Sequence, residues 1–238
     1  MLIAAHRGHS AARPENTLQA FEAAIAAGAD FIETDPRLTR DGVVVCFHDP
    51  TLQRRAGRPD AIADTDFNAL RGIALEGGGR VPALEEVLDL ARGRVAVVLD
   101  VKIAGPDMQA RLAVLAARAG MRDAIVQGVR SVRDCQTLAA RRACRDILAF
   151  MPKDQTIESF AEAGATIIRL WEEDVIDDRL AAIHRTGCRA WVTCGLRSAS
   201  EAAGHCEPGR VAGLVAQGVD GIILNDPEMA RRSLAGGI

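Results

Sequence analysis

Short apolar runs rich in β-branched residues alternate along the chain with amphipathic segments rich in Ala, Leu and Arg. The first amphipathic segment, Thr17–Ala27, places Leu18, Phe21 and Ile25 on one face and is followed by Gly28, so it predicts a helix. Nearly continuous apolar strands with helices between them are typical of parallel pairing. The expected strands are Leu2–His6, Phe31–Leu38, Val95–Lys102, Ala124–Gly128, Ile147–Met151, Thr166–Trp171, Arg189–Thr193 and Gly221–Leu224.

Repetition of this strand–helix unit through the whole chain favours an α/β fold, a single (β/α)₈ TIM barrel in one domain, residues 1–238. A doubly wound open sheet stays open as an alternative, because periodicity does not reveal whether the sheet closes. One unit departs from the pattern. A second short strand, Val43–His48, and a Gly/Asp/Arg-rich stretch precede the helix near Leu84–Ala91, so we expect a small insertion after strand two, at about 43–82.

Composition narrows the function classes. A net charge of −3 and a pI near 6.0 argue against a nucleic-acid binder. No apolar run is long enough for a membrane span or a secretory signal, so we expect no stable membrane association. The 6 cysteines show no metal-type spacing and predict a reduced, cytoplasmic setting. The oligomeric state is left open.

Ionisable residues stand at the ends of the first strands. Glu33 and Asp35 close the second strand, Asp100 and Lys102 close the third, and the histidines His6 and His48 end the first strand and the extra strand. The carboxyl ends of barrel strands meet at one mouth, where active sites are assembled. A single acid at a strand end is usually solvated or a cap, whereas this combination indicates a site.

The residue types predict phosphoryl chemistry. Three carboxylates without clustered His or Cys ligands predict one divalent cation, Mg²⁺ or Ca²⁺, held by Glu33, Asp35 and Asp100. Lys102, one of two lysines in a chain that otherwise uses arginine, supplies a compact charge for a phosphate oxygen. The two histidines can assist the nucleophile and protonate the leaving alkoxide.

Short motifs in fixed order closely resemble the glycerophosphodiester phosphodiesterase family. They are His6-Arg7-Gly8, Pro14-Glu15-Asn16-Thr17, Glu33-Thr34-Asp35, Thr39-Arg40-Asp41-Gly42, His48-Asp49-Pro50-Thr51-Leu52, Val81-Pro82-Ala83-Leu84-Glu85-Glu86-Val87-Leu88 and Gly218-Val219-Asp220-Gly221-Ile222-Ile223. The resemblance spans nearly the whole chain and is densest over residues 5–102.

The resemblance implies a TIM barrel whose insertion caps the site and a small phosphodiester substrate hydrolysed to glycerol 3-phosphate and an alcohol. It implies that His6 and His48 are the catalytic pair and that Arg7 contacts the phosphate. Glu15 would support His6 or the metal, or is an ordinary helix-start acid. Trp171 and Trp191 lie near strand ends, where each can stack on the alcohol or pack in the core.

At a few positions the sequence departs from the family pattern, and these departures leave alternative reactions open. Asp100-Val101-Lys102 replaces E-x-K, and the same D-x-K occurs in related sphingomyelinase D-like phospholipases, so a cyclising, phospholipase D-like reaction on a lysophospholipid or another phosphodiester stays open. Cys194 replaces an amide near the site, and Asn225 stands where the family has T-D-x-P. A non-catalytic phosphate-ligand binder is a further alternative. The alcohol is not identified.

Overall fold

The computed structural model describes residues 1–102, 106–151, 155–197 and 203–236. Eight parallel strands close into a barrel, because β1 pairs with β2 on one side and with β10 on the other. This closure confirms the expected (β/α)₈ barrel and excludes the open sheet. The barrel strands are β1 (Leu2–Ala5), β2 (Phe31–Thr34), β5 (Ala96–Leu99), β6 (Ile125–Val129), β7 (Asp146–Ala149), β8 (Ile167–Trp171), β9 (Arg189–Thr193) and β10 (Gly221–Leu224).

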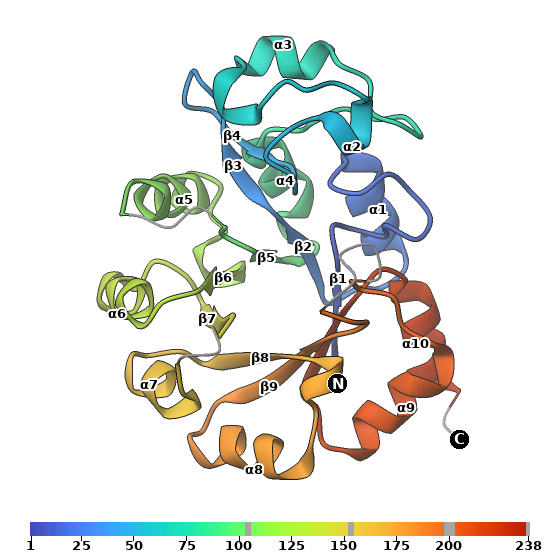
Figure 1. The fold of residues 1–238 in the computed structure, drawn as a ribbon, viewed down its shortest axis with the longest axis vertical. Helices are drawn as coiled ribbons and strands as arrows, with labels where there is room; N and C mark the ends of the chain where they lie inside the picture. Colours follow the sequence, from blue (N-terminus) through green and yellow to red (C-terminus); the bar gives the residue numbers. More distant parts are fainter. Residues whose placement is uncertain (103–105, 152–154, 198–202, 237–238) are drawn as a thin grey trace.

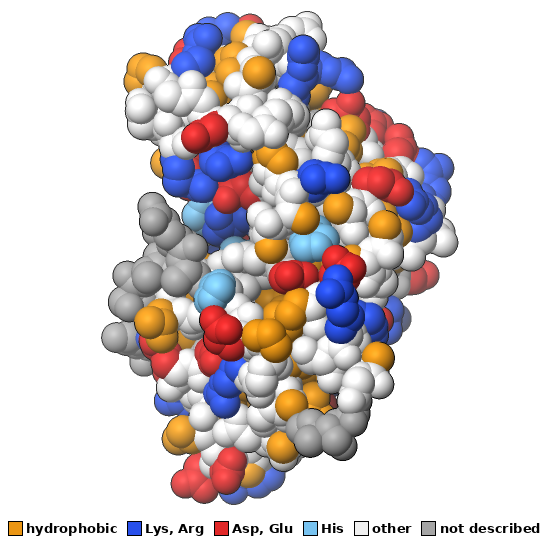
Figure 2. All heavy atoms as spheres, turned by 90° about the vertical axis from the view of Figure 1, so that its right-hand side faces the viewer, with side chains coloured by type: hydrophobic (Ala, Val, Ile, Leu, Met, Phe, Trp, Pro, Cys, Tyr) orange, Lys and Arg blue, Asp and Glu red, His pale blue; other side chains and the backbone are white. Residues whose placement is uncertain are grey.

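Helices surround the barrel, one after each strand (Figure 1). They are α1 (Leu18–Ala26), α4 (Leu84–Ala91), α5 (Pro106–Arg118), α6 (Val132–Arg141), α7 (Ile157–Glu162), α8 (Asp177–Arg185), α9 (Pro208–Ala216) and α10 (Pro227–Ala235). Among the described residues no helix has the length and apolar character needed to cross a bilayer. On the face shown in Figure 2, basic and acidic side chains are interspersed, and hydrophobic side chains gather only in small groups.

Alternate strand residues fill the barrel interior, since successive side chains of a strand point to opposite faces. Phe31, Val98, Ile167 and Trp191 belong to this inner core, and the rings of Phe31 and Trp191 meet edge to face at 5.0 Å. The interior is therefore closed by side chains, and any site must lie above this layer, at the carboxyl ends of the strands.

The second unit carries the expected insertion, but its boundaries differ from the sequence prediction. The predicted strand Phe31–Leu38 is two strands: β2 ends at Thr34, and β3 (Pro36–Leu38) leaves the barrel to pair antiparallel with β4 (Val44–Cys46). Pro36 has no N–H to donate to the barrel ladder, which explains the break. The insertion continues with α2 (Gln53–Ala56), a 3₁₀ helix (Ile62–Asp64) and α3 (Phe67–Gly72), and it packs on a small core of its own.

The turn after β1 brings the first motif against α1. Gly8 has φ +80°, and a Cβ at this position would lie 2.6 Å from the backbone carbon of Ala20. Thr17 caps α1 by accepting a hydrogen bond from the Ala20 N–H at 3.2 Å. Only glycine fits this left-handed, tightly packed turn, which holds the preceding His6 and Arg7 at the barrel mouth.

Substitution of Gly8 by alanine should lower the free energy of unfolding by about 2–4 kcal/mol, because it adds backbone strain and a clash with α1. Urea denaturation measures this change. Gly187→Ala is the matched control, since Gly187 also has φ +80° but has no atom within 4 Å of the added Cβ. We expect about 1 kcal/mol there. Equal losses in the two variants would show that the contact with α1 is unimportant.

Candidate active site

Three buried carboxylates meet where β2 and β5 end. Glu33 lies in β2, and Asp35 and Asp100 follow β2 and β5 directly. The Asp100 N–H donates to the Thr34 carbonyl at 2.9 Å, so the ladder between the two strands sets the acids side by side. One ligand atom from each carboxylate lies within 4.8 Å of the others, a spacing that suits a divalent metal ion. The structure thus brings together the three predicted acids.

The acids differ in their charge environments. Burial, with the negative charges of Asp35 and Asp100, raises the pKa of Glu33 well above its usual value. Burial alone would also raise the pKa of Asp35, but the positive charges of Lys102 and Arg7 outweigh it and hold that pKa well below its usual range. Glu33 is therefore the carboxylate whose charge the protein itself does not compensate. A cluster of oxygen donors with one uncompensated buried acid fits a hard cation.

Two basic side chains contact the acids from the cavity side, and one of them, Lys102, bridges two of the acids. The Lys102 Nζ donates to Asp35 Oδ1 at 2.6 Å and to Asp100 Oδ2 at 2.7 Å, and Arg130 Nη2 lies 2.6 Å from Asp100 Oδ1. Lys102 is where the sequence predicted a charge. Arg130 was not predicted, although it follows β6 directly, as Asp35 follows β2. Its position directly after a strand is the one feature of the sequence that could have marked Arg130 as a site residue.

His6 follows β1, and a side chain from the opposite end of the sequence orients its ring. Nδ1 lies 2.8 Å from Oδ1 of Asn225, which follows the neighbouring strand β10. An amide oxygen only accepts, so Nδ1 carries the hydrogen and Nε2 presents a lone pair. Burial and the nearby charge of Arg7 lower the pKa of His6 to about 4. The His6 ring is therefore neutral near pH 7.

His48 lies after β4, and a carboxylate orients it instead. Its Nδ1 is 2.7 Å from Asp49 Oδ1, and its carbonyl oxygen accepts from the Arg37 Nε at 2.9 Å. Burial, helped by the positive charges of Arg7 and Lys102, lowers the pKa of His48, while the charge of Asp35 and the hydrogen bond to Asp49 act in the opposite direction. The two rings thus have different partners: an amide for His6 and an acid for His48.

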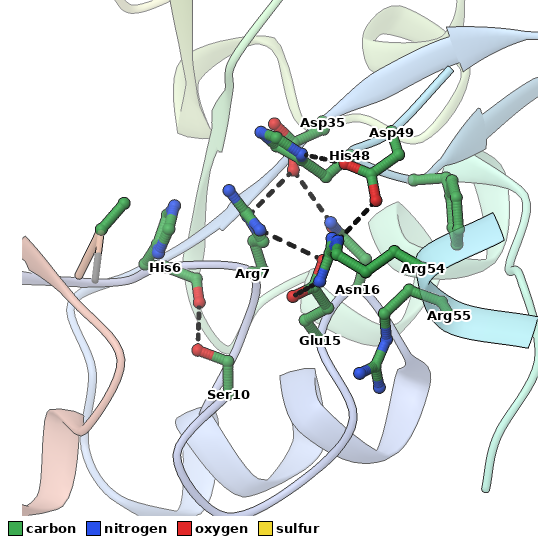
Figure 3. Close-up of polar contacts among 12 residues, drawn as sticks. His6, Arg7, Ser10, Glu15, Asn16, Asp35, His48, Asp49, Arg54 and Arg55 are labelled. Atoms are coloured by element: carbon green, nitrogen blue, oxygen red, sulfur yellow. Dashed lines mark hydrogen bonds and ion pairs between the residues drawn. The ribbon is translucent and has the colours of Figure 1, made fainter. Parts of the chain in front are cut away.

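A chain of polar contacts connects His48 with the carboxylates (Figure 3). Arg54 Nε donates to Asp49 at 2.6 Å, and its Nη2 donates to Glu15 at 2.6 Å. Glu15 in turn accepts from Arg7 Nη1 at 3.1 Å, and Arg7 Nε lies 3.6 Å from Asp35. His48, Asp49 and Arg54 belong to the insertion, whereas Arg7, Glu15 and Asp35 lie in loops that follow β1 and β2, so the chain of contacts ties the insertion to the barrel mouth.

One cavity of about 210 Å³ collects most of the predicted residues. Its walls include His6, Arg7, Glu33, His48, Asp100 and Lys102. Asp35 lies buried beneath them, in contact with Lys102. A carboxylate cluster, two histidines and the basic side chains of Arg7 and Lys102 around one small space are an arrangement suited to a phosphate ester.

Comparison with known proteins identifies the family. The family model described as the glycerophosphoryl diester phosphodiesterase family matches residues 6–159, more than half of the chain. The chain belongs to the glycerophosphoryl diester phosphodiesterase family. The matched residues include the three carboxylates, both histidines and the insertion that lies between β2 and α4.

Individual relatives of this family member cover less of the chain. A glycerophosphodiester phosphodiesterase of Bacillus altitudinis is 38% identical over 108 residues, which are 42% of this chain and 44% of that protein. The chain thus spans under half the length of such curated relatives. In fold it is similar to a glycerophosphodiester phosphodiesterase of Parabacteroides distasonis, with TM-score 0.81, 20% identity and coverage of 99% and 97% of the two chains. A phosphodiesterase of Oleispira antarctica, solved in complex with the product sn-glycerol-3-phosphate, has TM-score 0.78, 17% identity and coverage of 99% and 97%.

Three residues of this glycerophosphoryl diester phosphodiesterase family member lie elsewhere than at the cavity wall. Trp191 is fully buried and packs in the barrel core, which was one of the two positions expected for it. Trp171 lines the cavity instead. Cys194 is buried in the outer core, and its neighbour Thr193 lines the cavity instead. Glu15 supports Arg7 and touches Arg54 rather than His6. Alternation along β9 explains the positions of Trp191 and Thr193.

Proposed function

We propose that this protein hydrolyses glycerophosphodiesters to glycerol 3-phosphate and an alcohol, with His6 and His48 as the acid–base pair and a divalent cation at the carboxylate cluster. The observation that carries the proposal is that one cavity is lined by both histidines together with Glu33 and Asp100. Family membership supports it, as do the similarity to the Bacillus altitudinis glycerophosphodiester phosphodiesterase and the product bound to the Oleispira antarctica enzyme.

Glu33, Asp35 and Asp100 would hold the cation, Mg²⁺ or Ca²⁺, since all their donors are oxygens. When bound, the cation neutralises phosphate charge and orients the ester. Arg7 and Lys102 line the same cavity and would bind the non-bridging phosphate oxygens. Both already contact Asp35, so their positions are set before the substrate enters.

The two histidine environments support a different role in proton transfer for each ring. His6, neutral and with Nε2 unprotonated, suits the general base that takes a proton from the attacking water. His48 suits the general acid that protonates the leaving alkoxide, because Asp49 orients its ring and favours the imidazolium, against the burial that lowers the pKa of His48. A base with an amide partner and an acid with a carboxylate partner match the chemistry of ester cleavage.

A panel of glycerophosphodiesters, each incubated with Mg²⁺ and with Ca²⁺ and followed by phosphorus NMR, tests the function. We expect cation-dependent formation of glycerol 3-phosphate, a monoester. A cyclic phosphate as the accumulating product would indicate attack by a substrate hydroxyl, the phospholipase D-like alternative. Turnover of no diester with either cation would contradict the proposal.

Substitution of Asn225 by aspartate should shift the acidic limb of the pH profile of kcat/KM upward by about one pH unit. A carboxylate at 2.8 Å from Nδ1 stabilises protonated His6 and raises its pKa, and the base must be neutral to act, so activity is lost at a higher pH as the solution is acidified. Ser10→Ala is the control, because it removes a 3.0 Å contact to Asn225 without adding charge and should leave the limb in place. An unmoved limb in Asn225→Asp would count against His6 as base.

A further inference from the structure

The catalytic cavity opens into a second hollow over the ends of β6, β7 and β8. This hollow of about 900 Å³ shares Arg130, Phe150, Arg169, Trp171 and Arg197 with the cavity that holds the histidines. The catalytic cavity of about 210 Å³ leaves little room beyond the phosphate and its glycerol. Another hollow, of about 420 Å³, adjoins His6 and His48 on the side of the insertion. The hollow over β6, β7 and β8 is the larger of the two, and we take it as the place of the alcohol half of a diester.

Arg169 stands in the middle of that wall. Arg169 lies two residues after Ile167 and two before Trp171 in β8, so the three side chains point to the same face of the strand. Ile167 packs in the barrel interior, and the side chain of Arg169 therefore also points to the inside of the barrel. Its guanidinium carbon lies 4.3 Å from the ring centroid of Trp171 and 4.8 Å from that of Phe150. Two aromatic faces thus hold a planar cation at the boundary between the two spaces.

The charge of Arg169 has no anionic partner among the residues that the structure describes. Its Nε is buried without a hydrogen-bond acceptor. The neighbouring cations differ in this respect, since Arg130 pairs with Asp100 and Arg197 pairs with Asp174. Burial and the positive charges of Arg130 and Arg197 lower the pKa of Arg169 to about 10, which still leaves it charged near pH 7. A partly buried guanidinium with free donors is costly unless an anion binds to it.

We propose that Arg169, held between Phe150 and Trp171, binds a second anionic group of the substrate, so that preferred substrates are glycerophosphodiesters whose alcohol carries a carboxylate or a phosphate. The proposal rests on the proposed function and adds the substrate class. Guanidinium groups bind both kinds of anion through paired N–H donors, and stacking on the rings fixes the plane of the group.

A cationic alcohol such as choline fits this wall poorly. Aromatic faces commonly bind quaternary ammonium groups. Here the faces of Phe150 and Trp171 are already covered by Arg169, and Arg130 lies 4.5 Å from the Phe150 centroid. An incoming ammonium would meet two guanidinium groups. The same aromatic residues therefore favour an anion at this end of the substrate.

Two substrate pairs test the proposal on the unaltered protein. Glycerophosphoserine and glycerophosphoethanolamine differ by one carboxylate, and bis(glycerophospho)glycerol and glycerophosphoglycerol differ by a second phosphodiester. We expect kcat/KM to be about tenfold higher or more for the acidic member of at least one pair, and which pair shows it distinguishes carboxylate from phosphate. Equal values within both pairs would overturn the anion site while leaving the hydrolase function standing. Hydrolysis of none of the four would overturn both.

Variants locate the effect at Arg169. In Arg169→Gln the acidic-to-neutral ratio of kcat/KM should fall toward one, whereas Arg169→Lys, which keeps the charge, should retain part of it. Arg141→Gln, an exposed residue at the end of α6, removes the same charge far from the hollow and should keep the ratio. An unchanged ratio in Arg169→Gln would overturn the assignment. Because the readout is a ratio between two substrates, partial misfolding of a variant does not imitate the expected result.

Discussion

Replacement of His6 by alanine should lower kcat/KM for a glycerophosphodiester by about 10³-fold, within the range typical of a lost general base. The contact between Nδ1 and Asn225 leaves Nε2 of His6 with a free lone pair, and the ring lines the cavity. The pKa of His6, lowered to about 4, keeps the ring neutral near pH 7. Steady-state kinetics with a cation present measure the loss. His184→Ala is the matched control, because His184 lies on α8 and pairs with Asp220, just before β10, at the opposite end of the barrel.

Substrates with different leaving groups distinguish the role of His48 from that of His6. In His48→Ala the loss should be large for glycerophosphoethanolamine, whose alkoxide needs a proton, and much smaller for bis(p-nitrophenyl) phosphate, whose phenolate does not. In His6→Ala the losses should be similar for both substrates, because the attacking water needs a base in either case. A His6→Ala protein that keeps nearly full activity on both would contradict the proposed pair.

Replacement of Glu33 by glutamine should weaken binding of the divalent cation by about 100-fold or more and abolish cation-dependent activity. Glu33 is one of the three clustered carboxylates. Glutamine has the same size and keeps an oxygen that can accept from the Arg7 backbone N–H, which lies 2.8 Å from Oε2 of Glu33, but it removes the negative charge. Isothermal titration with Mg²⁺ and Ca²⁺ measures the affinity. Glu85→Gln removes the same charge from an exposed position on α4 and should bind the cation normally.

The same Glu33→Gln substitution should stabilise the protein when no cation is present, raising Tm by about 2 °C or more. The raised pKa of Glu33 means that its charged form is disfavoured in the folded state. Below the unfolded pKa both states are protonated and the acid costs nothing, and the cost develops as the pH rises from the unfolded pKa to the folded one, above which it is complete. The Tm gain of the variant should therefore grow with pH. A lower Tm at every pH would show that the acid is compensated without a cation.

Much of the fold and of the carboxylate cluster could be predicted from the sequence. Strands in a parallel barrel all end at one rim, so residues at the ends of successive strands are neighbours whatever the loops do. That rule places Glu33, Asp35, Asp100 and Lys102 together, as the structure has them. It failed where local chemistry interrupts a strand, since Pro36 turns the predicted strand Phe31–Leu38 out of the barrel.

The sequence by itself determined the barrel units and the acids and histidines at the strand ends, because both depend on local periodicity and on which residues close each strand. Only the tertiary structure decided the partners and charge states of those residues. Asn225 lies 219 positions from His6, yet closure of β1 on β10 puts them in contact, and this contact sets the tautomer. Arg169 likewise meets Phe150 only because β7 and β8 are adjacent in the closed barrel. Such contacts depend on side-chain packing between distant segments, which no local pattern encodes.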